Sequence, residues 1–211
     1  MKKEKVVITG SEGLLGRSIA SSLGKSHDVL KLSRRLGHDL TDEAFVKEWF
    51  AKNKADYLVN CFGMNDAVTE GGKRGSLFEV SLSSVEEFLR VNVVSLFSVC
   101  REFARNRRAR GIVNLSSIYG VVSPVPSLYK KGEKHIGYSV SKAAVIQLTR
   151  HMAVHLSPRV RVNCIVPGGA KDSQGRQFIK EYGGRVPPGG MMARSGLDGI
   201  VGYLCSGKSS Y

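Results

Sequence analysis

The sequence Lys5-Val-Val-Ile-Thr-Gly10-Ser-Glu-Gly13-Leu-Leu-Gly16, near the start of the chain, sets the architecture. Its first five residues are mostly apolar and β-branched, which predicts a short buried strand. Three glycines follow at intervals of three, and residues 17–23 then have a helical pattern that Gly24 ends. Glycines permit a tight turn, and a helix N-terminus offers unpaired N–H groups to a pyrophosphate. An unliganded loop is the alternative, but the position after the first strand favours nucleotide binding.

Strands and helices alternate along the rest of the chain. Apolar runs predict strands at 29–32, 57–61, 112–115 and 159–166, and amphipathic patterns predict helices at 43–52, 83–105, 137–155 and 196–204. Thr41 or Asp42 would cap the helix at 43, and Ser83 with Glu86 forms a capping box for the long helix. The alternation predicts a single α/β Rossmann domain over 1–211, a doubly wound parallel sheet in three layers. Residues of about 168–195, rich in Gly, Pro and charge, are expected to form a mobile substrate lid.

The length of 211 residues suits one domain with a sizeable core. No apolar run reaches membrane-spanning length, and the N-terminus lacks the apolar core of a signal peptide, so we expect a cytoplasmic protein without a membrane partner. The four cysteines are far apart and form no Cys/His cluster, which predicts reduced thiols and no metal site.

The charge is strongly basic, with 32 Lys and Arg against 18 Asp and Glu and a formal net charge of +14. Such a balance favours anionic partners: nucleic acid, acidic membranes or phosphorylated small molecules. The densest basic group comprises Arg101, Arg105, Arg107, Arg108 and Arg110. It ends a predicted helix and has no interleaved aromatic residue beyond Phe103, so a solvated helix end is favoured over a nucleic-acid site.

The second predicted strand ends in Ser33-Arg34-Arg35. In a doubly wound nucleotide-binding fold this position meets the adenosine ribose. An acidic residue there would accept hydrogen bonds from both ribose hydroxyls, whereas arginine accommodates a 2′-phosphate. The two arginines therefore favour NADP(H) over NAD(H), the alternative being two ordinary exposed arginines.

A candidate catalytic group lies in Tyr138-Ser-Val-Ser-Lys142, read together with Ser117 and Asn92. Residues four apart share one helix face, so the Lys142 ammonium would lie beside the Tyr138 phenol and lower its pKa from near 10. Ser117 follows a predicted strand, at the end that faces a ligand crevice. Asn92 is an amide within an apolar helical stripe, where a satisfied core asparagine is the common alternative.

Together these stretches resemble the short-chain dehydrogenase/reductase family over nearly the whole chain. Thr9-Gly10-x-x-Gly13-x-x-Gly16 is similar to its cofactor fingerprint, Asp39-Leu40 to its adenine contact, Asn60-Cys-Phe-Gly63 to its Asn-Asn-Ala-Gly, and Pro167-Gly168 to its nicotinamide-side turn. The resemblance implies these cofactor-binding residues: Gly10, Ser11, Glu12, Gly13, Leu14, Leu15, Gly16, Ser33, Arg34, Arg35, Asp39, Leu40, Asn60, Cys61, Phe62, Gly63, Tyr138, Lys142, Pro167 and Gly168.

The resemblance also implies catalytic roles for four residues. Tyr138 exchanges a proton with the substrate oxygen while a hydride moves to or from NADP (preferred) or NAD. Lys142 lowers the pKa of Tyr138 and hydrogen-bonds the nicotinamide ribose, and Ser117, preferred to Ser116, stabilises the substrate oxygen. Asn92 holds a water that links Lys142 to solvent.

The chain departs from the family pattern in several places. The glycine spacing is usual in the longer epimerase-like branch, the gap from Ser117 to Tyr138 is long, and no threonine follows Pro167-Gly-Gly near Ala170. The chain also stops where relatives continue into a strand that helps form a dimer contact. A homodimer or homotetramer is expected, with its form open.

The leading hypothesis is an NAD(P)-dependent oxidoreductase for a carbonyl/secondary alcohol pair. Ser-Ser-Ile-Tyr-Gly120, the long loop and Pro-Gly-Gly are similar to members of bacterial surface-sugar pathways, and the basic loop with Lys130, Lys131 and Lys134 would suit an anionic sugar. Two alternatives stay open: a sugar-nucleotide epimerase or dehydratase with tightly bound cofactor, and a non-catalytic nucleotide-binding protein.

Overall fold

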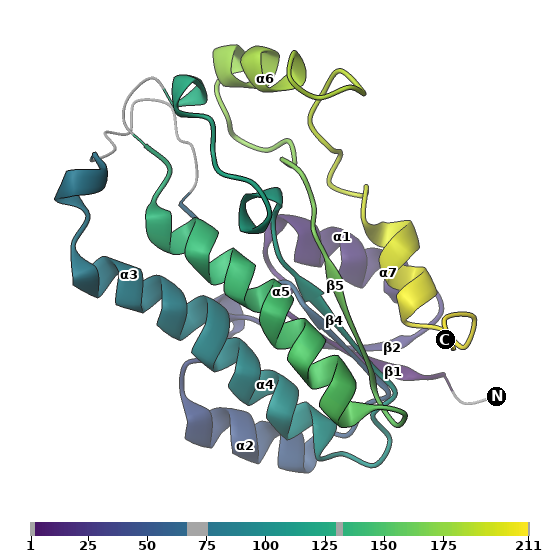
Figure 1. The fold of residues 1–211 in the computed structure, drawn as a ribbon. Coiled ribbons are helices and arrows are strands. Elements are labelled where there is room, and N and C mark those ends of the chain that lie inside the picture. Colours follow the sequence, from purple (N-terminus) through teal and green to yellow (C-terminus); the bar gives the residue numbers. More distant parts are fainter. Residues whose placement is uncertain (1–2, 67–75, 130–132, 211) are drawn as a thin grey trace.

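A parallel five-stranded sheet forms the centre of the computed structural model, which describes residues 3–66, 76–129 and 133–210 (Figure 1). The strands pair side by side in the order β2-β1-β3-β4-β5. Their bounds are β1 Lys5–Thr9, β2 Asp28–Leu32, β3 Tyr57–Asn60, β4 Gly111–Leu115 and β5 Arg161–Ile165. The order reverses between β1 and β3, and in such sheets ligands bind outside the carboxyl ends of the strands at this switch point. The predicted doubly wound parallel sheet is confirmed.

Helices cover both faces of the sheet (Figure 1). One face carries α1 (Leu14–Leu23) and α7 (Asp198–Leu204), and the other carries α2 (Glu43–Lys52), α4 (Ser95–Ala104) and α5 (Ile136–Leu156). Helix α3 (Leu82–Leu89) packs along α5, and α6 (Arg176–Gly183) lies beyond the carboxyl ends of the strands. The three predicted layers are therefore present.

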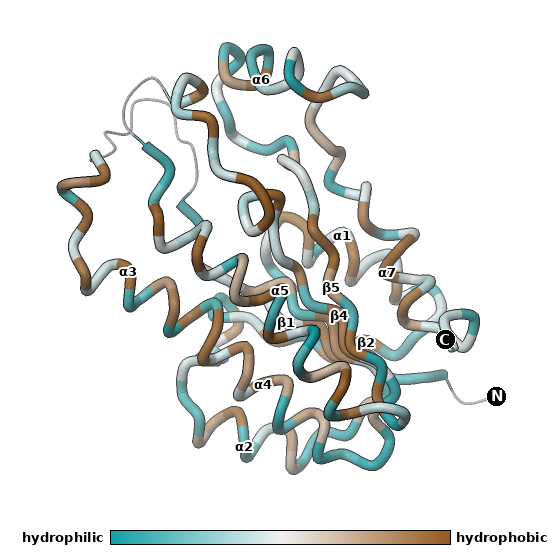
Figure 2. The backbone as a smooth tube through the Cα atoms, in the orientation of Figure 1, coloured by the Kyte–Doolittle hydropathy of each residue, from teal (hydrophilic) through white to brown (hydrophobic). Residues whose placement is uncertain are grey.

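The strands are buried on both faces, which explains their continuous apolar sequence. Alternate side chains of a strand point to opposite faces. Val6 and Ile8 of β1 accordingly join the core under α1 and α7, whereas Val7 joins the core under α2, α4 and α5. Figure 2 shows the sheet as the most hydrophobic part of the backbone trace. Because both faces of the sheet are buried, the carboxyl ends of the strands, which carry the candidate site residues, are held in fixed positions.

The long helix begins earlier than its predicted cap. Ser81, in extended conformation, accepts a hydrogen bond from the Ser84 N–H, so α3 starts at Leu82 and the predicted capping box at Ser83 is wrong. A real capping box, Ser76 with Glu79, instead starts the single-turn helix Leu77–Glu79. A π-helical turn, Arg90–Val94, joins α3 to α4. Asp42 caps α2, as one of the two predicted alternatives.

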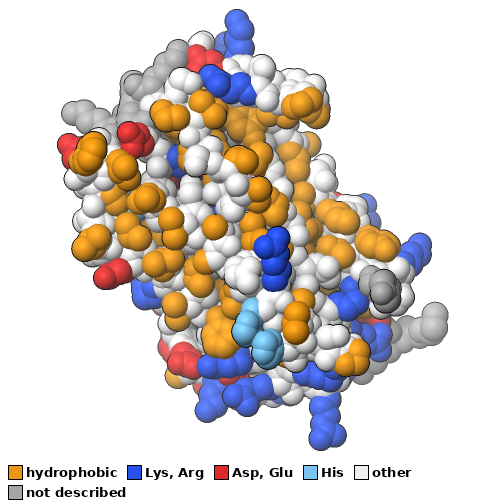
Figure 3. All heavy atoms as spheres, viewed as in Figure 1, with side chains coloured by type: hydrophobic (Ala, Val, Ile, Leu, Met, Phe, Trp, Pro, Cys, Tyr) orange, Lys and Arg blue, Asp and Glu red, His pale blue; other side chains and the backbone are white. Residues whose placement is uncertain are grey.

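Apolar side chains are exposed on the outer face of α3, α4 and α5 (Figure 3). Leu82, Val94, Phe97, Val140 and Val154 are all more than two-fifths exposed, at 81%, 62%, 42%, 46% and 76%. Among the described helices, none combines the length and the apolar character that crossing a membrane requires.

Candidate active site

The glycine turn between β1 and α1 brings two backbone segments into close contact. Gly10 has a φ of 64°, and a Cβ there would lie 2.5 Å from the backbone nitrogen of Phe62. A Cβ on Gly16 would lie 2.2 Å from the Gly10 carbonyl oxygen. Gly13 is the N-cap of α1 and has no capping side chain, so the first N–H groups of the helix stay available to an anionic group. These features fit a pyrophosphate.

A cavity of about 470 Å³ opens beside this turn at the switch point. Eleven predicted cofactor residues line it: Gly10, Glu12, Gly13, Ser33, Arg34, Arg35, Asp39, Leu40, Cys61, Phe62 and Gly63. The sequence interpretation missed six further lining residues: His38, Thr41, Met64, Glu87, Arg90 and Val91. Thr41 and His38 adjoin a recognised motif, but Arg90 enters through the π-helical turn, for which the sequence carries no clear signal.

The end of β2 gathers positive charge at one side of this cavity. Ser33 accepts a hydrogen bond from the Arg35 N–H, and the Arg35 guanidinium donates to the Glu12 carbonyl at 3.2 Å. The Glu12 carboxylate is itself paired with Arg17 and Lys31. Arg34 is exposed at the start of a short turn. Two guanidinium groups therefore border the space expected for the adenosine ribose.

Asp39 lines the same side of the cavity, but its carboxylate is hydrogen-bonded within its own turn. Its carboxylate accepts hydrogen bonds from the backbone N–H of Thr41, at 2.9 Å, and from the Thr41 hydroxyl, at 2.8 Å. These bonds, with smaller contributions from Arg90 and Arg34, lower the pKa of Asp39. The charged carboxylate thus fixes the loop that carries Leu40 against the cavity.

The remaining predicted cofactor residues lie outside the lining of this cavity. The Ser11 hydroxyl donates to the Leu32 carbonyl, and Asn60 is buried between Thr9 and Asn114 within the sheet. Both side chains stabilise the backbone that the cavity uses. The others outside the lining are Leu14, Leu15, Gly16, Tyr138, Lys142, Pro167 and Gly168. Their cofactor contacts stay predictions.

Ser117 and Tyr138 come together at the carboxyl end of β4. Burial raises the pKa of Tyr138 above its ordinary value. The nearby Ser117 hydroxyl acts in the opposite direction and lowers the pKa of the phenol, but by less. The segment that carries Ser117 packs tightly on α5: a Cβ on Gly120 would lie 2.7 Å from the Lys142 backbone. The structure therefore places the predicted proton donor and its serine within direct reach of each other.

Lys142 lies deep beneath Tyr138. Its Nζ donates a 3.0 Å hydrogen bond to the Leu115 carbonyl and lies 5.9 Å from the centroid of the Tyr138 ring. Burial disfavours the charged ammonium and lowers its pKa to about 8. The predicted lowering of the Tyr138 pKa by Lys142 is not apparent in this arrangement and stays a prediction.

Asn92 joins three segments around Lys142. Its Oδ1 accepts from the Met64 N–H at 2.6 Å, and its Nδ2 donates to the Met64 carbonyl at 3.0 Å and to the Ser141 hydroxyl at 2.9 Å. A Cβ on Gly63 would lie 3.0 Å from Asn92 Oδ1 and 3.5 Å from Lys142 Nζ. The π-helical turn thus holds Asn92 in the site, as such turns often do. Its water-holding role stays a prediction.

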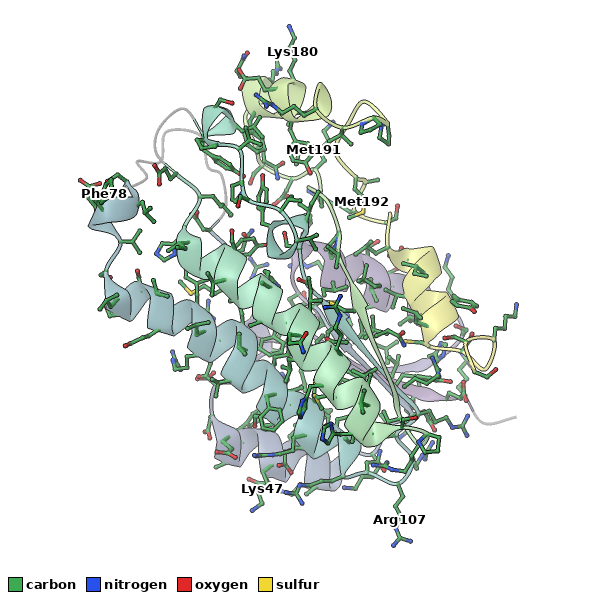
Figure 4. The ribbon with its side chains drawn as sticks, viewed as in Figure 1. Lys47, Phe78, Arg107, Lys180, Met191 and Met192 are labelled. Carbon is green, nitrogen blue, oxygen red and sulfur yellow. The ribbon has the colours of Figure 1, made fainter. Side chains whose placement is uncertain are left out.

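The segment after β5 folds over the turn Pro167–Gly169. The Gly169 N–H donates a 2.6 Å hydrogen bond to the Tyr182 hydroxyl of α6. A Cβ on Gly169 would lie 2.8 Å from the Met191 methyl carbon, which explains why the turn has a second glycine. Met191 and Met192 lie on the strand-like segment between α6 and α7 (Figure 4). The predicted lid residues therefore contact the turn that is expected to face the nicotinamide.

A second cavity, of about 350 Å³, lies between the start of α3 and the segment before α5. It is lined by Asp66, Leu77, Glu79, Val80, Ser81, Ser84, Glu133, Lys134, His135 and Ile136. Lys134, which the sequence places in the basic loop that would suit an anionic sugar, has a side chain only 5% exposed. Lys130 and Lys131 lie outside the described residues.

Comparison with known proteins identifies the family. A family model described as enoyl-(acyl carrier protein) reductase matches residues 5–211. The 3-oxoacyl-[acyl-carrier-protein] reductase FabG of Aquifex aeolicus is 28% identical over 98% of this chain and 82% of its own length. The human mitochondrial dehydrogenase/reductase SDR family member 2 is 34% identical over 97% of this chain and 81% of its own.

A solved structure shares both sequence and fold with this chain. The short chain dehydrogenase from Leptospira borgpetersenii with bound NAD+ is 27% identical and aligns with a TM-score of 0.85. The alignment covers 100% of this chain and 89% of the other. From the match of sequence over nearly the whole chain and the agreement in fold, it follows that this chain is an oxidoreductase that belongs to the short-chain dehydrogenase/reductase family.

Proposed function

We propose that the chain transfers a hydride between NAD(P)(H) and a carbonyl or secondary alcohol, with Tyr138 as general acid and base. The observation that carries this proposal is the approach of the Ser117 side chain to the Tyr138 phenol, which acts to lower the phenol pKa, one helical turn from the buried Lys142. A phenol beside a hydroxyl donor and an ammonium is suited to exchange a proton with a substrate oxygen. The glycine turn and its cavity support binding of the cofactor at the adjacent strand ends.

In this proposal the protein positions reactants, and the bound nicotinamide supplies or accepts the hydride. During reduction the Ser117 hydroxyl donates a hydrogen bond to the carbonyl oxygen and Tyr138 gives that oxygen its proton. During oxidation Tyr138 takes the proton of the alcohol. The Lys142 ammonium holds the nicotinamide ribose and favours the phenolate. Asn92 holds Met64 and the helix around Lys142, which keeps these groups in register.

NADP(H) is the cofactor we propose as preferred, with NAD(H) as the alternative. Arg34 and Arg35 line the cavity at the end of β2, and Arg90 adds a third guanidinium. A 2′-phosphate would make charge-assisted hydrogen bonds with such groups. Of the carboxylates in the lining, Asp39 is already engaged by Thr41. Glu12 is likewise paired, with Arg17 and Lys31, so neither carboxylate at this end of the cavity is free to replace the arginines as a ribose-side contact.

We propose a sugar or sugar derivative with an anionic group as the first substrate class to test. The excess of 32 basic over 18 acidic residues supports attraction of anions. Nucleic acid is not part of the proposal, because four of the five clustered arginines form ion pairs with carboxylates of the same chain. These are Arg101, Arg105, Arg108 and Arg110, paired with Glu102, Glu43, Asp56 and Glu4.

Assembly and location complete the proposal. The exposed apolar face of α3, α4 and α5 supports a homodimer or homotetramer, since such a face is often an interface. Light scattering that gives the mass of one chain would refute it. Four free cysteines support a reducing location, the cytoplasm.

Fluorescence titration with NADPH and NADH tests cofactor binding, and a panel of carbonyl compounds and sugar derivatives tests turnover. Saturable binding followed by cofactor oxidation with one class of carbonyl is expected. Cofactor that copurifies and survives dialysis, with no net oxidation, would instead favour the epimerase or dehydratase. Binding without any turnover would favour a nucleotide-binding protein.

A further inference from the structure

A second lysine lies against Tyr138, nearer than Lys142. The Nζ of Lys134 is 4.3 Å from the centroid of the Tyr138 ring, compared with 5.9 Å for Lys142. A cation at this distance over an aromatic face is attracted by the electrons of the ring. Lys134 precedes Tyr138 by four residues as Lys142 follows it by four, so one stretch of chain supplies both ammonium groups.

The position of Lys134 is fixed by the segment that follows β3. Its Nζ donates hydrogen bonds to the side-chain oxygen of Asn65, at 3.2 Å, and to the backbone carbonyl of Asp66. The Asp66 carboxylate lies 3.9 Å from the same nitrogen and accepts a 2.8 Å hydrogen bond from the His135 N–H. An ammonium with a side chain only 5% exposed would be costly without such partners. Asn65 and Asp66 therefore hold the Lys134 ammonium in a defined position.

Two features of the surroundings of Tyr138 oppose its phenolate. Burial and the negative charge of Asp66 both disfavour the phenolate. An ammonium within about 4–6 Å favours the charged form of a neighbouring acid. Phe88, edge-on to the phenol at 6.4 Å, offers no charge. Within residues 3–66, 76–129 and 133–210, the charged or titratable groups around the ring are Lys134 and His135 before α5, Lys142 in α5, Asp66 after β3 and Tyr119 after β4.

We propose that Lys134 is a positioning residue for Tyr138, whose ammonium orients the phenol ring and offsets the negative charge of Asp66 so that the phenolate can form. The inference rests on the proposed function, in which Tyr138 is the general acid and base. It assigns Lys134 a role beside Tyr138, in addition to its place in the basic loop before α5. It also links the ring to the segment after β3, which forms one wall of each cavity.

The test is a pH titration of the Tyr138 phenolate by its ultraviolet absorbance, with Tyr138→Phe as the blank, in proteins that carry changes at Lys134 or Asp66. Lys134→Met keeps the length of the side chain and removes its charge, and it should raise the pKa of Tyr138 by about one unit or more. Lys134→Arg keeps the charge and should shift that pKa by less than about half a unit. Asp66→Asn removes the opposing charge and should lower the pKa.

The pKa of Tyr138 should thus rise in Lys134→Met and fall in Asp66→Asn. Loss of structure would instead shift this pKa in the same direction in both variants. An unchanged pKa in Lys134→Met, or in Lys134→Gln if the methionine variant does not fold, would overturn the inference. The titration needs no turnover, so it is independent of the proposed function. If Tyr138→Phe kept full activity, the proposed function would fail instead, whatever the titration gave.

Discussion

The Ser116 hydroxyl donates a 2.7 Å hydrogen bond to the backbone carbonyl of Lys142, which locks the end of β4 to α5. The next residue, Ser117, is thereby held with its side chain toward Tyr138. Two adjacent serines thus have different tasks, although the sequence makes them look alike. One fixes the distance between the two halves of the site, and the other faces the proposed substrate oxygen.

Exchange of each serine for alanine should separate these tasks. Ser117→Ala removes a donor to the reacting oxygen and should lower kcat about 100-fold or more, with little change in thermal stability. Ser116→Ala removes a buried hydrogen bond between β4 and α5 and should cost about 1 kcal/mol of unfolding free energy. Steady-state kinetics and denaturant unfolding of both variants provide the check. A larger loss of kcat in Ser116→Ala than in Ser117→Ala would reverse the assignment.

The arginines at the end of β2 should select the cofactor. Arg34→Ala combined with Arg35→Ala removes charge-assisted contacts to a 2′-phosphate, so the Kd for NADPH should rise about 10- to 100-fold. NADH lacks that phosphate, and its Kd should change less than about threefold. Fluorescence titration measures both constants. The exposed pair Arg105→Ala with Arg107→Ala, at the other end of the sheet, is the matched control. Equal losses for the two cofactors would contradict the preference for NADP(H).

Burial of Lys142 should make stability depend on pH. Because its pKa falls from 10.5 to about 8 on folding, the unfolded chain binds more protons between these values. Stability relative to Lys142→Met should therefore rise with pH from about 8 to about 10.5 and be constant below. At pH 7 the variant should be more stable by about 1–3 kcal/mol, although it has lost activity. Thermal unfolding of both proteins across this pH range is the measurement. If the stability of the two proteins changed with pH in the same way, folding would not lower the pKa of Lys142.

Features that depend on short stretches of sequence could be predicted before the fold was known. Apolar runs located all five strands, and the glycine spacing located the turn where Gly10 touches Phe62. Helical spacing put Tyr138 and Lys142 on one face of α5. Each of these depends on a pattern within a few residues, so it can be read before the fold is known. The pairing of Ser117 with Tyr138 was predicted from the resemblance to the family motif alone.

Features made by contacts between distant segments were not accessible. Arg90 lines the cavity from the start of a π-helical turn, and Lys134 is buried against Asn65 and Asp66. Asn60 belongs to a cofactor-binding motif in the sequence, yet its side chain is hydrogen-bonded to Thr9 and Asn114 inside the sheet. Burial and partner choice are properties of the packed chain, so spacing along the sequence could not reveal them.

The most direct test of the central claim is NADPH oxidation by the wild-type chain and by Tyr138→Phe, each with the best carbonyl substrate of the panel. The variant removes only the phenolic hydroxyl and keeps the ring that packs against Phe88 and Lys134. Loss of the acid and base should lower kcat at least about 100-fold, while the Kd for NADPH stays unchanged. Turnover by Tyr138→Phe at a rate close to that of the wild type would contradict the account.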